Sequence, residues 1–250
     1  MTAPLHHRRC WSPTKKSRTR QLLITAGPTY EPIDSVRFIG NRSSGRMGIA
    51  LAEAAAQLGW EVTLLLGPVS AAVPTHDRIR VERFRTCADL QQLLSTHADR
   101  ADILIMAAAV ADYRPKPTPA MSDGKFRRTG GSITLELEST PDLLAGISAS
   151  RRADQLFVGF ALEPRADLLA SAESKLKRKK IDLVVANPLE TMDSDTVEAT
   201  VLAADGSVEH AGGLLSKTDF ARWLLARIAQ QADSRETSAR PTRAALATAA

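Results

Sequence analysis

Residues 22–26, Leu22-Leu23-Ile24-Thr25-Ala26, together with the alanine-rich stretch 45–58 decide the fold. The first is a short, nearly continuous apolar run, which is typical of a β-strand that is covered on both faces. The second has the composition of an α-helix, and Gly59 follows it as a helix-ending residue. A buried strand followed by a helix is the repeating unit of a parallel sheet.

The same alternation continues along the chain. Thr86 and Asp89 form a capping-box pattern that predicts the start of a helix running to about residue 98. Further helices are expected from near Pro141, over 164–179 and from Ser216 onward, and further strands over 62–66, 103–107, 132–137, 157–160, 183–186 and 197–202. The sequence therefore predicts an α/β fold, a Rossmann-like, doubly wound, mostly parallel sheet with helices on both faces. Ligands of such sheets bind beyond the carboxyl ends of the strands, here in the loops after residues 26, 107, 160 and 186.

Charge and composition separate the ends of the chain from its middle. Residues 1–20 hold six Lys or Arg and no acid, and residues 233–250 carry a net charge of +1, so the stretch 21–232 has a net charge of −2 out of the total of +5. We expect a disordered basic leader over 1–20, a single domain over 21–232 and a disordered tail over 233–250. The charge predicts no nucleic-acid partner. Two cysteines and the lack of any apolar run near the roughly 20 residues of a membrane span predict a cytoplasmic protein without membrane attachment.

The segment between the first strand and the first helix, 27–45, is too long for an ordinary connection of this kind, and long ordered loops are usually functional. Ser43, Ser44 and Gly45 lie where the helix begins, so their N–H groups and hydroxyls would suit a phosphate. In the alternative interpretation, a serine only caps the helix and Gly48 only permits close packing of helix on strand. Both interpretations stay open.

A nicotinamide dehydrogenase is the obvious rival for such a fold. The glycine pattern G-x-G-x-x-G does not follow the first strand, and the second strand ends in Leu66-Gly67 without the acid that binds the adenosine ribose. The residues four positions after the two tyrosines are Asp34 and Pro117, so no Tyr-x-x-x-Lys pair is present.

Several ordered blocks resemble one family. They are 24–29, 41–48, 107–115, 140–143, 158–161, 175–180 and 185–187. In this order they resemble phosphopantothenate–cysteine ligases, the synthetase half of the bacterial bifunctional coenzyme A flavoprotein, over about 22–227. The resemblance implies a stand-alone ligase that joins phosphopantothenate to cysteine through an acyl-nucleotidylate and forms a homodimer. It would use Mg²⁺ and either CTP or ATP, with CTP expected first, and the run 188–192 leaves that choice open. No flavodoxin-like segment precedes residue 21, so no flavin is expected here, and a separate flavin-dependent decarboxylase chain would supply the next step. A nucleotide-binding regulatory module without turnover and a nicotinamide-dependent oxidoreductase are the alternatives.

The resemblance also assigns roles to residues. Asn41 would handle the acyl intermediate, and Lys125 would reach over the phosphates from a mobile loop. The nucleotide-binding positions implied are Gly27, Ser43, Gly45, Gly48, Ala108, Ala109, Asp112, Pro141, Asp142, Leu143, Phe160, Lys175, Lys179 and Asn187. Lys175 and Lys179 share one helix face at this spacing, although a solvated basic helix end would look the same. No metal ligands are assigned, and Pro28 departs from the glycine that the family usually has.

Overall fold

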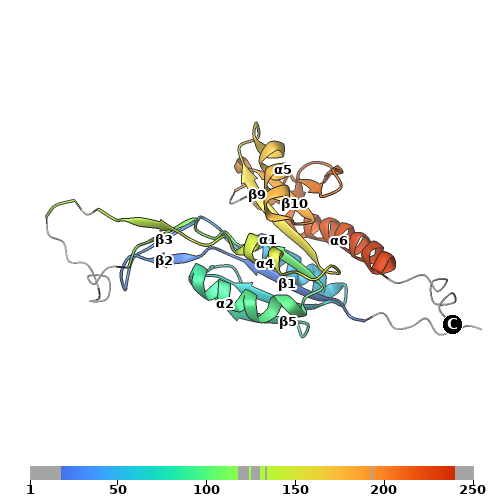
Figure 1. The fold of residues 1–250 in the computed structure, drawn as a ribbon, viewed down its shortest axis with the longest axis horizontal. Coiled ribbons are helices and arrows are strands. Elements are labelled where there is room, and N and C mark those ends of the chain that lie inside the picture. The colour runs from blue at the N-terminus through green and yellow to red at the C-terminus, as the bar shows by residue number, and fades with distance from the viewer. Residues whose placement is uncertain (1–17, 118–123, 125–129, 133, 193, 240–250) are drawn as a thin grey trace, which may run out of the picture.

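An eight-stranded sheet forms the centre of the molecule in the computed structural model, which describes residues 18–117, 124, 130–132, 134–192 and 194–239 (Figure 1). Its strands, in spatial order, are β13 (Val208–His210), β12 (Thr200–Ala203), β10 (Leu183–Pro188), β9 (Leu156–Glu163), β6 (Ile103–Met106), β1 (Gln21–Ala26), β4 (Glu61–Leu66) and β5 (Ile79–Arg83). The six strands from β10 to β5 are parallel, and β12 and β13 are antiparallel. The predicted mostly parallel sheet is confirmed, and β5 is a strand that the sequence reasoning missed.

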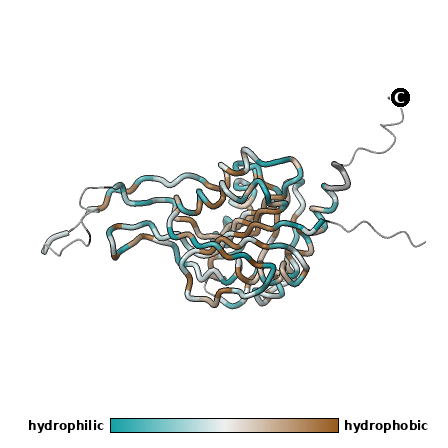
Figure 2. Tube along the Cα trace, turned by 90° about the horizontal axis from the view of Figure 1, so that it is seen from below, coloured by the Kyte–Doolittle hydropathy of each residue, from teal (hydrophilic) through white to brown (hydrophobic). Residues whose placement is uncertain are grey.

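Helices cover both faces of this sheet, as predicted. On one face α1 (Arg46–Gln57) packs against α6 (Lys217–Ala239), and on the other lie α2 (Cys87–His97), α4 (Leu143–Ala149) and α5 (Leu168–Lys179). Neighbouring residues of one strand point to opposite faces, so Ile24 belongs to the first core and Leu23 to the second. Fully burying one such side chain contributes roughly 1.5–3 kcal/mol to the free energy of unfolding. Figure 2 shows this apolar material gathered in the body.

One helix begins where the sequence predicts, and another begins later. Helix α2 begins with the predicted capping box, in which Asp89 N donates to Thr86 Oγ1 at 3.1 Å and Thr86 N donates to Asp89 Oδ2 at 2.9 Å. Helix α5 begins at Leu168, four residues after the expected start, because the residues after Pro164 form a turn. Short 3-10 helices occupy Ala98–Arg100 and Leu189–Thr191.

An arm of short strands extends from one end of the body (Figures 1 and 2). It contains an antiparallel pair formed by β2 (Tyr30–Pro32) and β3 (Phe38–Gly40) and a second pair formed by β7 (Tyr113–Pro115) and β8 (Leu137–Ser139). The expectation of a sheet strand over 132–137 is therefore wrong. The strand begins at Leu137 and pairs with β7 on the arm, where Leu137 is exposed, so its alternating pattern did not mark the central core. A last pair, β11 (Thr196–Val197) and β14 (Leu215–Ser216), lies outside the main sheet.

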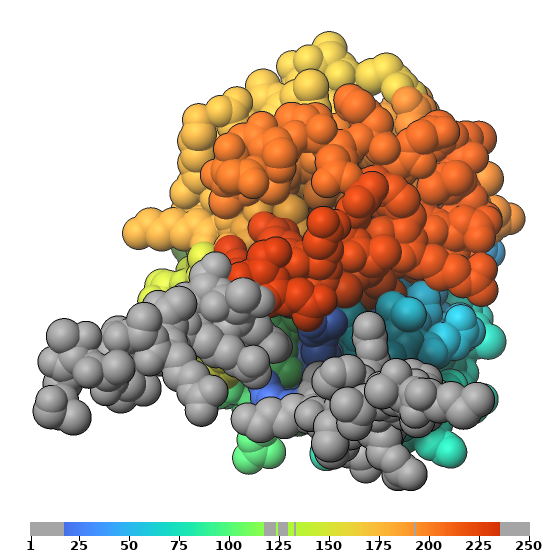
Figure 3. All heavy atoms as spheres, turned by 90° about the vertical axis from the view of Figure 1, so that its right-hand side faces the viewer, coloured from blue at the N-terminus to red at the C-terminus, as the bar shows by residue number. Residues whose placement is uncertain are grey.

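The last helix extends past the expected end of the domain. Helix α6 continues to Ala239, so the disordered tail expected from residue 233 is wrong for 233–239. Arg235 explains the difference, because its guanidinium donates to Gln155 O at 2.8 Å and to the buried Asp182 at 2.5 Å. Figure 3 shows the red atoms of α6 lying along the body beside the cyan segment that contains α1. Among the described residues no helix is both long and apolar enough to cross a bilayer.

Candidate active site at the carboxyl ends of the central strands

The strand order places a crevice between β1 and β6. From β1 the chain continues to β4 and β5 on one side of the sheet, and it then returns to β6 on the other side. At such a switch point the loops after the two strands diverge and leave room for a ligand. Two adjoining cavities lie there, a large lobe of about 640 Å³ and a small lobe of about 240 Å³. The residues that line both lobes are Ala108, Val110, Asp112, Phe160 and Lys175.

The start of α1 forms one wall of the large lobe. Gly45 is the N-cap residue and has a left-handed backbone with φ of 71°, and no side chain caps the helix. The alternative in which Ser43 or Ser44 acts as the cap is therefore wrong, and both serines line the large lobe. The packing interpretation of Gly48 is confirmed, since a Cβ there would lie 2.4 Å from the Cβ of Ala26. Gly48 also lines the lobe.

Asn41 reaches the same lobe from the end of the arm. Its side-chain Nδ2 donates to Val110 O at 3.0 Å, which ties the loop after β3 to the loop after β6. Both residues line the large lobe, together with Ala109. The hydrogen bond fixes the orientation of the amide and leaves its second N–H and its oxygen for other partners.

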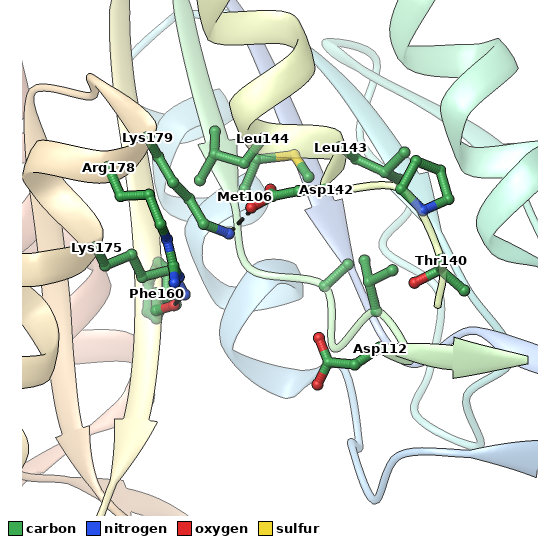
Figure 4. A pocket seen from close by; sticks show the side chains of 13 residues that line it. Met106, Asp112, Thr140, Asp142, Leu143, Leu144, Phe160, Lys175, Arg178 and Lys179 are labelled. Carbon is green, nitrogen blue, oxygen red and sulfur yellow. Dashed lines mark hydrogen bonds and ion pairs between the residues drawn. The ribbon is translucent and has the colours of Figure 1, made fainter. Parts of the chain in front are cut away.

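Basic side chains of α5 form one side of the small lobe (Figure 4). Lys175 donates to Phe160 O, and Lys179 Nζ lies 3.0 Å from Asp142 Oδ1. Burial, together with the positive charge of Lys179, lowers the pKa of Lys175 to about 8. Arg178 projects toward the tip of Lys175 in Figure 4 and lines the same lobe. Three cations from one helix end thus border one small cavity, which is the charge pattern of an anion site.

Asp142 holds the opposite wall. It is the N-cap of α4, with Oδ1 accepting from Ala145 N at 3.1 Å. Burial disfavours its ionised form, but the Ala145 N–H and the nearby Lys179 outweigh this effect and lower the pKa of the carboxyl. Pro141, Leu143 and Asp142 line the small lobe, as does Asp112.

Strands β9 and β10 end at the large lobe. Phe160 is only partly buried and lines both cavities, so it is not an ordinary core residue. Asn187 lines the large lobe, and its Oδ1 is buried without a hydrogen-bond partner among the described residues. A buried acceptor of this kind is costly unless a ligand satisfies it.

The structure thus gathers most of the predicted residues around the two lobes. Gly27 is different, because it packs against Gly45 and Val69 and lines neither lobe. Lys125 lies outside the described residues. Sequence reasoning assigned no role to Arg178, which its position three residues after Lys175 would have indicated, or to Thr140, which opens the matched block 140–143.

Fold and site define a doubly wound α/β domain with a cavity at its switch point that is bordered by three basic side chains of α5. The chain belongs to the family of the DNA/pantothenate metabolism flavoprotein C-terminal domain, whose family model matches residues 17–232. This agrees with the resemblance drawn from the ordered sequence blocks.

Curated relatives are larger proteins. The chain is 42% identical over 200 residues to the coenzyme A biosynthesis bifunctional protein CoaBC of Mycobacterium tuberculosis, covering 75% of this chain and 47% of that one. It is 39% identical over 216 residues to the CoaBC of Bacillus subtilis, covering 84% and 51%. It is also 48% identical over 170 residues to a cysteine/cysteine sulfinic acid decarboxylase of an unknown prokaryotic organism, covering 68% and 46%. The chain spans about half the length of the curated relatives that it matches.

Solved structures agree on the fold. The C-terminal domain of a CoaBC protein superposes with a TM-score of 0.72 at 34% identity, covering 86% of this chain and 96% of that domain. A Cab2 H337A mutant in complex with phosphopantothenate-cysteine superposes with a TM-score of 0.75 at 18% identity, covering 89% of each chain. At that identity the second likeness shows the fold alone.

Proposed function

We propose that this domain joins phosphopantothenate to cysteine through an acyl-nucleotidylate, with CTP rather than ATP as the nucleotide, as a step of coenzyme A biosynthesis. The observation that carries the proposal is the two-lobed cavity, with Asn41 on one wall and the three cations of α5 on another. The names of the CoaBC relatives support the choice of pathway.

The proposed chemistry has two steps. The carboxylate of phosphopantothenate attacks the α-phosphorus of the nucleotide, and pyrophosphate leaves. The amine of cysteine then attacks the activated acyl carbon, the nucleoside monophosphate leaves, and the amine loses a proton. The first step brings two anions together, and in the second step negative charge develops on the acyl oxygen and on the leaving phosphate. Fixed positive charge in a partly buried cavity lowers both barriers. Lys175, Arg178 and Lys179 supply that charge from the small lobe.

Asn41 is proposed to act on the acyl intermediate. Because Nδ2 already donates one N–H to Val110 O, the amide plane is fixed and the second N–H is aimed independently of substrate. A neutral donor of this kind stabilises charge that develops on an acyl or phosphate oxygen and does not itself react.

The end of β10 favours a particular kind of base. Cytosine and adenine carry an exocyclic amine where uracil and hypoxanthine carry a carbonyl oxygen. An acceptor such as the unpartnered Asn187 Oδ1 favours the amine. Phe160, at the edge of both lobes, offers an aromatic face for stacking. These contacts support CTP or ATP over UTP, and the preference for CTP remains part of the proposal.

Mg²⁺ is proposed to act with the nucleotide. Among the described residues no group of three or more His, Cys, Asp or Glu side chains is placed to hold a metal ion. Nucleotide-bound Mg²⁺ needs only one or two carboxylates, because phosphate oxygens and water complete its shell. Asp112 lines both lobes and fits that role. The ion would neutralise phosphate charge, which supplements the cations of α5.

A homodimer is proposed through the arm. Large apolar side chains stand exposed on its strands and turns, with Val36 57%, Phe38 42%, Tyr113 57% and Leu137 43% exposed. An apolar cluster that projects from the body is typical of an association surface. Light scattering of the purified protein, with Tyr113→Glu as the disrupting variant, tests this: a monomeric parent would contradict it.

The product of the proposed reaction is the substrate of a decarboxylase. We propose that this next, flavin-dependent step occurs on a separate chain and that both act in the cytoplasm, where nucleoside triphosphates are available. A relative with a decarboxylase name and the bifunctional CoaBC relatives support the link between the two activities.

Pyrophosphate release is the decisive measurement. We expect release with phosphopantothenate, cysteine, Mg²⁺ and CTP, and slower release with ATP. Omitting cysteine should leave a single burst of about one pyrophosphate per site, and omitting phosphopantothenate should abolish release. Nucleotide binding without any release would favour the regulatory module instead, and oxidation of a nicotinamide cofactor would favour the oxidoreductase.

A further inference from the structure

Two threonine hydroxyls hold the backbone of one residue, Ala111, beside the cavity. Thr29 Oγ1 accepts a hydrogen bond from Ala111 N at 3.0 Å, and Thr140 Oγ1 donates to Ala111 O at 2.6 Å. Thr29 lies in the loop after β1, and Thr140 lies between β8 and α4. Thr29 is fully buried and Ala111 is 4% exposed, so water does not easily replace the bond between Thr29 and Ala111.

The residues on either side of Ala111 belong to the proposed active site. Val110 O accepts the hydrogen bond of Asn41 at 3.0 Å. Asp112 lines both lobes, and its carbonyl oxygen accepts from Thr140 N at 2.9 Å. Thr29 holds the Val110–Ala111 peptide group, whose oxygen anchors Asn41, and Thr140 holds the Ala111–Asp112 peptide group, which leads to the carboxylate of Asp112. A shift of the Ala111 backbone would therefore move both.

We propose that Thr29 and Thr140 are positioning residues, which set Asn41 and Asp112 for the reaction through the backbone of Ala111. This inference rests on the proposed ligase function. Thr29 lines neither lobe, and the hydrogen bond of its hydroxyl to Ala111 N connects this side chain to the site. A displacement of about 1 Å of a reacting group can lower the rate on the order of 100-fold, so small shifts of Asn41 or Asp112 would slow the reaction.

Hydroxyl removal at constant shape provides the test. Thr29→Val and Thr140→Val keep the branched shape and remove the hydroxyl, whereas Thr29→Ser and Thr140→Ser keep the hydroxyl. We expect kcat for pyrophosphate release to fall about 10- to 100-fold in the valine variants, with KM for CTP changed by less than about threefold. The serine variants should stay within about threefold of the parent. Because both hydroxyls act on the two adjoining peptide groups of Ala111, the double valine variant should lose less than the product of the single losses.

A buried threonine away from the cavity serves as the control. Thr200 is 8% exposed, bonds the His210 ring at 2.9 Å and lines neither lobe. Thr200→Val should lower thermal stability and leave kcat within about twofold. Exchange of the Ala111 amide proton, followed by NMR, gives a readout without turnover: it should be about tenfold faster in Thr29→Val and little changed in Thr200→Val.

The outcomes separate this inference from the proposed function. A parent enzyme that releases no pyrophosphate contradicts the ligase proposal. Unchanged kcat in both valine variants of an active enzyme contradicts the positioning role of Thr29 and Thr140. Serine variants as slow as the valine variants would also overturn it, because the hydroxyl would then not be the cause. If Thr29→Val does not fold, Thr140→Val carries the test, since Thr140 is only partly buried.

Discussion

Lys179 Nζ lies 3.0 Å from Asp142 Oδ1, so the basic end of α5 is joined to the N-cap of α4 across the small lobe. One carboxylate therefore performs two tasks. It closes the first turn of α4 through Ala145 N, and it holds a lysine that faces the cavity. The structural role and the binding role of Asp142 are separable by substitution.

Asp142→Ala should lower the free energy of unfolding by about 0.5–2 kcal/mol, whereas Asp142→Asn, which can still cap, should cost less. Because the folded-state pKa of Asp142 is lowered, its contribution is present above the ordinary carboxyl pKa and is lost as pH falls through the folded-state value. Urea denaturation at pH 7 and at pH 3 measures both effects. Equal stability of the alanine and asparagine variants at pH 7 would contradict the capping role.

Lys175 should make nucleotide binding depend on pH. Its pKa of about 8 means that the free protein loses this charge as pH rises from 7 to 9. Affinity for CTP should therefore fall about tenfold over that range, and it should vary much less in Lys175→Met. Stability has the opposite sign: the unfolded chain binds more protons between pH 8 and the ordinary value of 10.5, so the free energy of unfolding rises with pH there. Calorimetric titrations at pH 7, 8 and 9 give the affinities, and equal slopes in both proteins would contradict this assignment.

Arg178→Ala should weaken CTP binding roughly 10- to 150-fold, the loss expected for a charge-assisted contact of about 1.5–3 kcal/mol. Lys177→Ala is the matched control on the same helix, because Lys177 is exposed, pairs with Glu173 at 2.5 Å and lines neither lobe. It should bind CTP within about twofold of the parent. Equilibrium binding of both variants decides the matter, and similar losses in the two would indicate a general charge effect.

Lys125 remains a prediction from the sequence. Lys125→Ala should reduce turnover more than it reduces CTP binding, because a residue that closes over the phosphates acts late in the reaction. The ratio of kcat to binding affinity measures this. Loss of binding alone, with normal kcat at saturating CTP, would show that Lys125 contributes to nucleotide binding and not to the transition state.

Asn41→Asp should still release one burst of pyrophosphate and should transfer the acyl group slowly to cysteine. The new carboxylate has no N–H for Val110 O or for the developing oxyanion, and it adds repulsion at both. Removing one such donor typically costs about 100- to 1,000-fold in kcat. Rapid-quench measurement of the burst and of product formation separates the steps, and normal steady-state turnover would exclude the assigned role.

Arg235→Ala should destabilise the protein by about 1–3 kcal/mol, since it removes one of the two arginines that pair with the buried carboxylate of Asp182. Arg151 keeps the carboxylate partly compensated, at 2.6 Å. A chain truncated after residue 239 should keep the parent melting temperature, whereas truncation after residue 232 should lower it. Equal melting temperatures of the two truncated proteins would show that the folded domain ends near residue 232, as its composition predicts.

The local sequence pattern was enough to predict most strands of the central sheet and the start of α2. Continuous apolar runs at 22–26, 62–66 and 103–106 became buried parallel strands, and the Thr86–Asp89 spacing became a capping box. The pattern failed at 132–137, because alternating residues on an exposed arm resemble those of a half-buried strand. It also failed at 233–239, where Arg235 of a polar segment bonds the distant Gln155 O and Asp182 carboxylate.

The sequence by itself determined the alternation of strand and helix and the family. It also determined which kinds of side chain the matched blocks contain. All of these depend on residue identity and on short spacings along the chain. Only the tertiary structure decided which residues meet. It brought Thr29 and Thr140, which are separated by 111 positions along the chain, to the backbone of the same residue, Ala111, and it placed Arg178 at the small lobe beside Lys175. It also placed Gly27 outside the cavity wall. The contact of Thr29 arises because β1 and β6 are neighbours in the sheet although they are far apart in the chain. No local pattern encodes where two such distant loops will touch.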